Sequence, residues 1–397
     1  MRHFHYATDE EVKTGKTTDI YFVRTKQVLE AKGLDKLRVV TEVTPGEIHK
    51  GWPWGILCGI EEEARLFEGC PVDVYAMPEG SVFYHTDHKG VREPVMMIEG
   101  SYGDFCLLET SLLGLLCQSS GVATRAARIK KVAGEKFVLA FGIRRMHPVL
   151  SPMLDRAAYI GGFDGVSSLM GAEAAGVEPS GTMPHALIIV FEDQVKAWRA
   201  FDEVMPQEVP RVALVDTYFD EKIESLMAAE ALKDRLDAVR LDTPGSRKGD
   251  FAEIVREVRW ELDVRGYNHV KIFVSGGLNE ETVRILSDAG ADAFGVGTAV
   301  SNAPTVDFAM DIVEVEGKLS AKRGKLGGRK QVWRCQKCLA DLVLPLDKSQ
   351  PKCPRCGGKT ESMLRPLIKN GKIVAKLPKP SEIREYVLEQ ISKLTLE

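Results

Sequence analysis

The sequence lacks a strong excess of charge, because 53 Lys and Arg residues against 57 Asp and Glu residues leave a net charge of −4. A protein whose whole surface binds nucleic acid would be strongly basic, so this composition argues against that class. No apolar run approaches the roughly twenty residues of a membrane span, and the first residues, MRHFHYATDEEVKTG, are polar and charged. We therefore expect a cytoplasmic protein without a membrane partner.

A motif for a Ser-His-Asp or Cys-His nucleophile is also lacking, which argues against hydrolases of those kinds. What is present is an ordinary apolar content: 44% of the 397 residues are hydrophobic, enough for a large core. The length predicts two or three domains.

Residues 1–121 are expected to form an α+β domain. Residues 8–35 have a helical pattern, and from Arg38 to Glu99 short alternating strands are separated by turns. The segment from Gly100 to Gly134 is the longest helical stretch. We expect this helix to bridge into the second domain.

Residues 122–330 follow a repeating strand and helix pattern. Such alternation predicts a parallel sheet, and the number of strands favours an α/β barrel, complete or incomplete, over an open sheet. The fold class is therefore α/β. The strand candidates are Phe137–Phe141, Gly165–Ser168, Ala186–Val190, Val212–Val215, Ala238–Leu241, Val270–Val274 and Ala293–Val296.

Two consecutive units of this region end their strands in bare turns. Ser275-Gly276-Gly277 follows one strand, Asn279 is a good N-cap for the next helix, and Gly297-Thr298 follows the second strand. Unpaired N–H groups at such a rim favour an anion, so the turns are candidates for a phosphate site. Plain tight turns remain the alternative, because Gly-rich turns are common.

Polar residues gather where the other strands end. Their chemistry suits a ribose with a phosphate group at each end: arginines grip phosphate or carboxylate, and aspartates hold Mg²⁺ or ribose hydroxyls. Each residue taken singly could be a satisfied structural group, and only the shared rim favours a site. The residues are Arg144, Arg145, Asp164, His185, Asp216, Thr217, Arg240 and Asp242.

Residues 331–362 predict a zinc ribbon. Two C-x-x-C pairs, Cys335 with Cys338 and Cys353 with Cys356, are a strong signal for tetrahedral zinc, and four Cys ligands make a closed, structural site. Pure scaffolding and binding of a partner both remain open. The other four cysteines are expected to be buried thiols. Residues 363–397 predict an amphipathic helix that docks back on the body, with Ile383, Val387, Leu388 and Ile391 on its apolar face.

Several motifs resemble those of nicotinate phosphoribosyltransferases, within the type II phosphoribosyltransferase fold shared with the nicotinamide and quinolinate enzymes. The resemblance extends from about Thr18 to Arg334, and the cysteine pairs resemble the form with an inserted zinc knuckle. The motifs are TDIYFVRT (18–25), PEGSVF (78–83), LLETSLLGLL (107–116), FGIRRMHP (141–148), IGGFDGVSS (160–168), GTMPHA (181–186), VALVDTY (212–218), VRLDTPG (239–245), VSGGL (274–278) and GKLGGRKQV (324–332).

The resemblance implies a role for each matching residue. Tyr21, from a neighbouring subunit, and Phe141 would sandwich the pyridine ring, and His185 matches the histidine that ATP-coupled members phosphorylate, with a structural role as the alternative. The implied catalytic residues are Arg144, His185, Asp216, Arg240 and Asp242. The implied substrate-binding residues are Tyr21, Phe141, Arg145, Thr182, Thr217, Ser275, Gly276, Gly277, Gly297 and Thr298.

The resemblance thus implies transfer of a phosphoribosyl group from 5-phosphoribosyl-1-pyrophosphate to nicotinate in NAD biosynthesis. It also implies structural Zn²⁺, Mg²⁺ with the pyrophosphate, ATP as an optional reactant, and at least a homodimer with shared active sites. The alternatives are the same fold acting on nicotinamide or quinolinate, and a zinc-ribbon protein that binds nucleic acid on an inactive scaffold.

Overall fold

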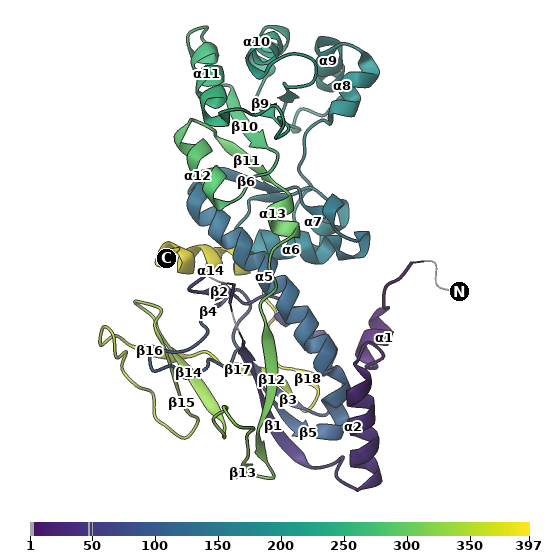
Figure 1. The fold of residues 1–397 in the computed structure, drawn as a ribbon, viewed down its shortest axis with the longest axis vertical. Coiled ribbons are helices and arrows are strands. Elements are labelled where there is room, and N and C mark those ends of the chain that lie inside the picture. Colours follow the sequence, from purple (N-terminus) through teal and green to yellow (C-terminus); the bar gives the residue numbers. More distant parts are fainter. Residues whose placement is uncertain (1–3, 47, 50) are drawn as a thin grey trace. The chain divides into compact units, whose positions relative to one another are not determined.

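The computed structural model describes residues 4–46, 48, 49 and 51–397 (Figure 1). Its residues form two compact units. Unit 1 combines the chain up to Thr124 with Pro304–Glu397, and unit 2 is Arg125–Ala303. The fold is mixed α/β, as predicted.

Unit 1 is built on a seven-stranded sheet in the order β13-β12-β1-β5-β3-β17-β18, in which the paired strands run antiparallel. Its apolar core includes Val43, Phe83, Met96 and Ile98. A two-stranded sheet, β2 with β4, lies in the same unit. The strands are β1 (Arg38–Pro45), β2 (Gly55–Ile56), β3 (Asp73–Ala76), β4 (Val82–Phe83), β5 (Met96–Ser101), β12 (Phe308–Val315), β13 (Lys318–Leu319), β17 (Arg365–Lys369) and β18 (Lys372–Ile373).

The pairing of β12 with β1 corrects the predicted limit of the second domain. Residues 304–330 were expected to belong to the barrel. Instead Val39 lies opposite Val315 and Pro45 opposite Phe308, so the chain re-enters unit 1 after Ala303. An isolated strand pattern does not reveal which sheet it joins, because a pairing partner far away in sequence decides that.

The helices of unit 1 include one long apolar stretch. Residues Tyr102–Ala133 are helical throughout, and this helix is long and apolar enough to cross a membrane by length and composition, although 56% of its most apolar part is buried inside the protein. The expectation that no apolar run approaches the length of a membrane span was therefore wrong. A buried core helix of a soluble protein can have the same length and apolar composition. The helices are α1 (Asp9–Lys13), α2 (Ile20–Ala31), α3 (Ile60–Phe67), α4 (Tyr102–Phe105), η1 (Cys106–Leu108) and α5 (Glu109–Ala133), which continues into unit 2.

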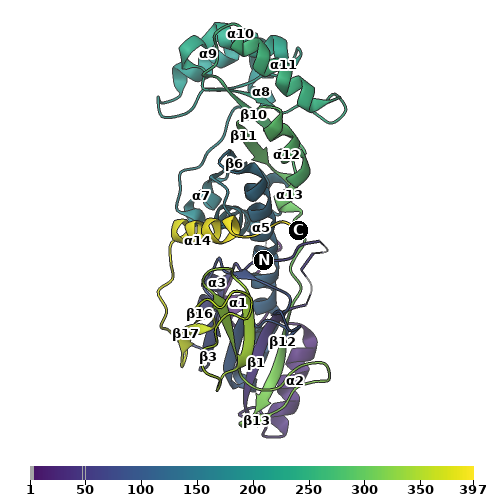
Figure 2. The same cartoon turned by 90° about the vertical axis from the view of Figure 1, so that its left-hand side faces the viewer.

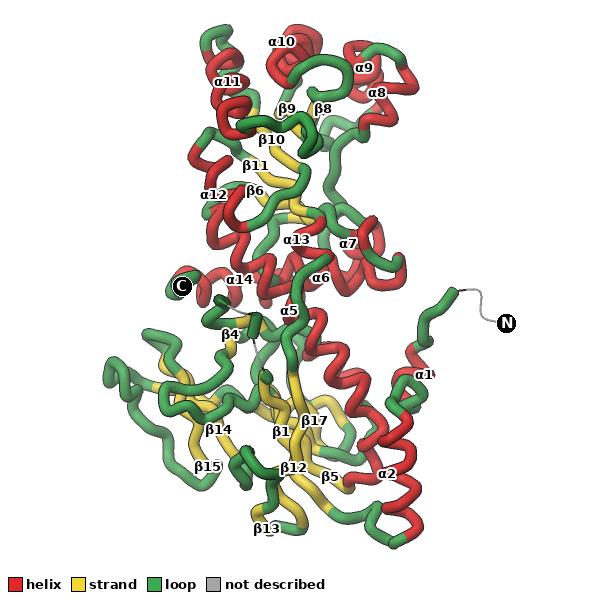
Figure 3. The backbone as a smooth tube through the Cα atoms, in the orientation of Figure 1, coloured by secondary structure: helices red, strands yellow, loops and turns green. Residues whose placement is uncertain are grey.

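Unit 2 contains six parallel strands in the order β7-β6-β11-β10-β9-β8. No pairing joins β7 to β8 among the described residues, which agrees with an incomplete barrel. In Figure 3 the helices of unit 2 lie around these strands. The strands are β6 (Phe137–Ala140), β7 (Gly165–Val166), β8 (Val212–Leu214), β9 (Ala238–Leu241), β10 (Lys271–Ser275) and β11 (Ala293–Val296).

The helices of unit 2 follow its strands along the chain, and Figure 2 shows α8 to α11 from a second side. They are η2 (Ile143–Arg145), η3 (Pro148–Leu150), α6 (Ser151–Ile160), α7 (Leu169–Ala175), α8 (His185–Phe191), α9 (Gln194–Val204), α10 (Glu221–Leu232), η4 (Lys233–Arg235), α11 (Phe251–Asp263), α12 (Glu280–Asp288) and α13 (Thr298–Ser301).

Helix α8 overturns one strand prediction. The segment Ala186–Val190 was expected to be a buried strand, but it is helical, begins after Pro184 at the N-cap, and packs against α9. Only Ile188 is buried in it, whereas Val190 is 79% exposed. A short apolar run with β-branched residues does not by itself distinguish a strand from a helix.

The C-terminal segments complete unit 1. A three-stranded sheet of β14 (Lys330–Cys335), β15 (Asp341–Pro345) and β16 (Thr360–Ser362) carries the cysteine pairs. Helix α14 (Pro380–Ser392) buries Ile383, Val387 and Ile391, and Gln390 bonds to both Gly80 and Val82. The predicted docking of the tail helix is confirmed, and β17 additionally joins the main sheet, which the sequence did not indicate.

Candidate functional site

A connected polar cluster lies at the carboxyl ends of β9 and β10. The Arg240 guanidinium donates from Nε to Ser275 Oγ at 3.0 Å, and its Nη2 lies 3.0 Å from Asp242 Oδ2. Ser275 Oγ donates to Asp242 Oδ1 at 2.7 Å. Arg240 Nη1 also donates to Thr182 Oγ1 at 2.7 Å, so a loop before α8 reaches the same point. These four predicted residues therefore come together.

Three further predicted residues join this cluster from β8 and α8. Asp216 follows β8, and its Oδ2 accepts the backbone N–H of Asp242 at 3.1 Å. His185 begins α8; its Nδ1 lies 3.0 Å from Thr217 Oγ1, and its Nε2 lies 3.8 Å from a carboxylate oxygen of both Asp216 and Asp242. One imidazole thus faces two carboxylates.

The electrostatics of this cluster favour shifted proton affinities. Burial, together with the nearby Asp242 carboxylate, raises the pKa of Asp216 to about 7. Burial lowers the pKa of His185; Asp242 opposes this shift and Arg240 adds to it. The buried Asp216 Oδ1 accepts no hydrogen bond from the described residues. This oxygen is therefore available to a cation or a hydroxyl group that enters the site.

Aromatic rings lie beside the arginine. Phe141 follows β6 with its ring centroid 5.9 Å from that of Phe273, and the Arg240 guanidinium carbon lies 5.1 Å from the Phe141 ring. Gly295 makes this arrangement possible, because a Cβ there would lie 2.5 Å from the Phe141 ring. The site thus offers a planar apolar surface next to a cation, which suits an aromatic ring that bears a carboxylate.

The two glycine turns leave backbone donors free. Gly276 and Gly277 have φ values of 87° and 72°, which favour glycine, and a Cβ at Gly277 would meet nothing within 4 Å. Among the described residues, the N–H groups of Gly276, Gly277, Gly297 and Thr298 donate no hydrogen bond. The predicted Asn279 cap is present as a capping box with Thr282. The turns therefore offer unpaired donors to an anion.

Other predicted residues lie outside this cluster. Arg144 and Arg145 lie in η2 after β6, are exposed, and form no ion pair with the described residues. Tyr21 lies in α2 of unit 1 and is 56% exposed. Asp164 bonds to Lys130 and to the backbone of Val138, so it has a structural role.

Sequence reasoning missed two buried residues that support the site. Glu224, on α10, is fully buried and accepts the backbone N–H groups of Thr217, Tyr218 and Phe219 at 3.1, 2.7 and 2.9 Å. Glu221, also on α10, accepts a hydrogen bond from Thr243 Oγ1. The sequence does place two acidic residues in the first turn of one helix. Acidic residues are common at that position because they interact favourably with the helix dipole, so they did not indicate a site.

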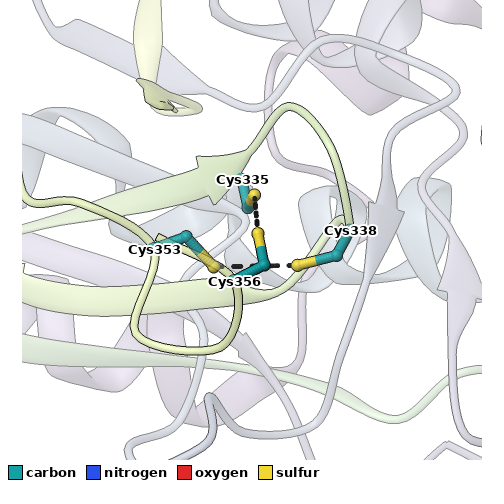
Figure 4. A group of neighbouring side chains, drawn as sticks. All are labelled: Cys335, Cys338, Cys353 and Cys356. Atoms are coloured by element: carbon teal, nitrogen blue, oxygen red, sulfur yellow. Dashed lines mark hydrogen bonds between the residues drawn. The ribbon is translucent and has the colours of Figure 1, made fainter. Parts of the chain in front are cut away.

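The four ribbon cysteines form a separate cluster. Their sulfur atoms all lie within 4.8 Å of one another, with Cys335 to Cys356 at 3.4 Å and Cys338 to Cys353 at 3.6 Å (Figure 4). Zn–S bonds of about 2.3 Å in a tetrahedron place sulfurs roughly 3.8 Å apart, so the cluster fits zinc. A Cβ at Gly358 would lie 3.3 Å from two of the sulfurs.

The ribbon is attached to its unit by buried charge. Arg334 donates to Asp341 at 2.9 Å and lies 3.7 Å from Glu93, and all three side chains are buried.

The environment of the cysteines differs between the cluster and the rest of the chain. Burial disfavours the ionised thiol of Cys335, but hydrogen bonds from the backbone N–H groups of Cys338 and Lys337 outweigh burial and lower its pKa to about 7. Of the four cysteines outside the cluster that were expected to be buried, Cys58 and Cys106 are buried, and Cys70 and Cys117 are half-buried.

The chain matches two families of known domains. The quinolinate phosphoribosyl transferase C-terminal domain matches residues 122–311, and the corresponding N-terminal domain matches residues 19–120. A solved structure from Pyrococcus furiosus, described as nicotinate-nucleotide pyrophosphorylase, is 57% identical over 99% of each chain, with a TM-score of 0.95.

Two proteins of Mycobacterium tuberculosis, both named nicotinate phosphoribosyltransferase, are also similar. One is 34% identical over 279 residues, which are 66% of this chain and 57% of that protein's length. The other is 30% identical over 319 residues, which are 77% of this chain and 68% of that protein.

Proposed function

Since the chain belongs to the nicotinate phosphoribosyltransferase family, we propose that it transfers phosphoribosyl from 5-phosphoribosyl-1-pyrophosphate to the ring nitrogen of nicotinate. The products are nicotinate mononucleotide and pyrophosphate. The observation that carries the proposal is the cluster of Arg240, Asp242 and Ser275 beside the unpaired N–H groups of Gly276 and Gly277. One rim thus holds groups for a ring carboxylate, a ribose and a phosphate.

The proposed mechanism needs no covalent protein nucleophile. Phe141 supports the pyridine ring while Arg240 faces its carboxylate, and the glycine turns hold the 5′-phosphate, so the ring nitrogen lies in line with the ribose anomeric carbon. As the bond to pyrophosphate breaks, the Asp216 and Asp242 carboxylates stabilise the positive charge that develops on the ribose. Positioning and electrostatic stabilisation supply the rate enhancement.

Mg²⁺ belongs to the proposal as the partner of the pyrophosphate. The unpaired Oδ1 of Asp216 and the adjacent Asp242 carboxylate supply the oxygen ligands that Mg²⁺ prefers. When bound, Mg²⁺ neutralises charge on the leaving pyrophosphate.

Coupling to ATP is a separable part of the proposal. The Nδ1 of His185 is held by Thr217, which leaves its Nε2 facing the site as a phosphoryl acceptor. If the coupling operates, ATP increases turnover of the native enzyme, and His185→Ala abolishes the increase while some basal turnover remains. Equal turnover with and without ATP would leave His185 with a substrate-ordering role.

A shared active site in a homodimer completes the proposal. Apolar side chains exposed on α2, namely Ile20, Tyr21 and Val28, are available to a subunit interface. Leu169 and Val190 of unit 2 are exposed in the same way. We expect Tyr21→Ala and Arg240→Ala each to be inactive alone. Mixed under subunit exchange, they should recover about a quarter of native activity, because half of the dimers then contain one intact site. No recovery from a mixture that contains heterodimers would exclude sharing.

The substrate assay decides among the bases. Purified protein is incubated with Mg²⁺, 5-phosphoribosyl-1-pyrophosphate and, separately, nicotinate, quinolinate or nicotinamide, and both products are followed. The quinolinate arm is required because the matching domain families carry that name. Turnover with nicotinate supports an enzyme of NAD biosynthesis. No turnover with any base, together with salt-dependent retention on RNA or DNA, would favour the nucleic-acid-binding alternative.

A further inference from the structure

A lysine outside the predicted site reaches the first glycine turn. Lys248 lies in the loop between β9 and α11, and its ammonium donates to the backbone carbonyl of Gly276. The ammonium also lies 4.6 Å from the ring centroid of Phe251, the first residue of α11. A loop that follows Asp242 thus carries a cation back to the end of the neighbouring strand.

This cation has no acidic partner at close range. Among the described residues, no carboxylate oxygen lies within 4.0 Å of the Lys248 ammonium, although the side chain is half-buried. Burial lowers its pKa, and the more distant Asp242 opposes that shift. An ammonium has three donors, and a neutral carbonyl satisfies only one of them. The environment around Lys248 therefore lacks a compensating negative charge.

The adjacent backbone also lacks a negatively charged partner. The N–H groups of Gly276 and Gly277 donate no hydrogen bond among the described residues, and the space beside Gly277 is open. Unpaired N–H donors and an ammonium without an acidic partner lie at one turn, and together they fit a phosphate monoester. The pyrophosphate end differs, because the carboxylates of Asp216 and Asp242 lie there and repel an anion unless a metal intervenes.

We infer that Lys248 binds the 5′-phosphate of the phosphoribosyl substrate, a role that rests on the proposed function. Lys248 supplies the charge that the neutral glycine turn cannot, and thereby distinguishes a phosphorylated ribose from an unphosphorylated one. It acts on binding of the substrate and takes no part in bond breaking.

The test separates the two ends of the substrate. Ribose 5-phosphate and, with Mg²⁺, pyrophosphate are titrated calorimetrically into the native protein, Lys248→Ala and Lys248→Arg. We expect Lys248→Ala to weaken ribose 5-phosphate binding by about 10- to 100-fold, as for a lost charged hydrogen bond, and to leave pyrophosphate binding unchanged. Lys248→Arg should restore most of the affinity. In turnover, KM for 5-phosphoribosyl-1-pyrophosphate should rise while kcat stays near the native value.

Lys271→Ala is the matched control, because Lys271 is an exposed lysine at the opposite end of β10. It should change neither titration, and the melting temperatures of the variants verify folding. The role of Lys248 would be overturned, while the proposed function stands, by either of two results. One is an unchanged ribose 5-phosphate affinity in a folded Lys248→Ala protein, and the other is an equal loss of affinity for pyrophosphate. If the native protein binds neither ribose 5-phosphate nor 5-phosphoribosyl-1-pyrophosphate, the proposed function fails as well.

Discussion

The base of the zinc ribbon and the rim of the parallel sheet use the same residue types in opposite ways. In the ribbon, Arg334 is buried against Asp341, and Lys330 is buried against Glu42. At the rim, Asp216 keeps a free oxygen, and Gly276 and Gly277 keep free N–H groups. Charge that holds a fold together is satisfied within the protein, whereas charge that serves a ligand retains unused bonding capacity.

Loss of a zinc ligand is the largest effect we expect. Cys353→Ser should release the metal and unfold the ribbon, because binding free energy of a structural zinc, roughly 10 kcal/mol or more in small domains, is folding free energy. Metal content by mass spectrometry and thermal unfolding measure this. Cys70→Ser, at a cysteine outside the cluster, is the control. A variant that loses zinc but keeps native unfolding would mean that the ribbon needs no metal.

Removal of the central arginine tests the rim. Arg240→Ala should lower kcat/KM, with a loss of roughly 4 kcal/mol of transition-state stabilisation. The reason is that the change removes the cationic partner of both Asp242 and the substrate anion. The melting temperature of Arg240→Ala should stay close to that of the native protein. Arg256→Ala, on the outer side of α11 and paired with Glu253, should remain fully active. Native efficiency in Arg240→Ala would remove this residue from the site.

Removal of the ribbon arginine should give the opposite pattern. Arg334→Ala leaves the buried Asp341 carboxylate without its cation, which should cost roughly 3 kcal/mol of unfolding free energy. Chemical denaturation measures the loss. A double variant, Arg334→Met with Asp341→Leu, should recover part of it. If Arg334→Ala destabilises no more than an exposed arginine such as Arg323→Ala, the buried network is not what attaches the ribbon.

Glu63 is an exception to the comparison, and its effect is small near pH 4.5 and grows above it. This carboxyl of α3 is fully buried, and neither oxygen has a hydrogen-bond partner among the described residues. Burial raises its pKa well above the ordinary value of 4.5, so the folded state retains a proton that the unfolded state releases. Its contribution to stability is therefore present below about pH 4.5 and decreases by about 1.4 kcal/mol per pH unit above it, until the folded-state pKa is passed.

Replacement of this carboxyl should remove that pH dependence. Glu63→Met should flatten the decrease in stability above pH 4.5, because no buried carboxyl remains to keep its proton, so its advantage over the native protein grows by about 1.4 kcal/mol per pH unit until the folded-state pKa is passed. Denaturant unfolding at several pH values measures both changes. The exposed Glu30→Gln serves as the control. A pH profile of Glu63→Met that parallels the native profile would assign the dependence to other groups.

The strands of the parallel sheet were largely predictable, and the supporting residues were not. Six of the seven candidates in unit 2 are strands, because buried parallel strands have continuous apolar runs bounded by turns. The segment Ala186–Val190 failed because its apolar run opens a helix. Glu224 and Lys248 were missed, since one acid in a helix and one lysine in a loop resemble many exposed residues of the same kind.

The sequence by itself determined the elements that depend on neighbouring residues. These are the alternation of strands and helices, the Gly276-Gly277 turn with positive φ, the Asn279 cap and the spacing of the four cysteines. Only the tertiary structure decided that β12 returns to pair with β1, that Glu224 holds the loop after β8, and that Lys248 reaches Gly276. Local patterns express backbone preferences, whereas these contacts join segments whose proximity arises only when the whole chain packs.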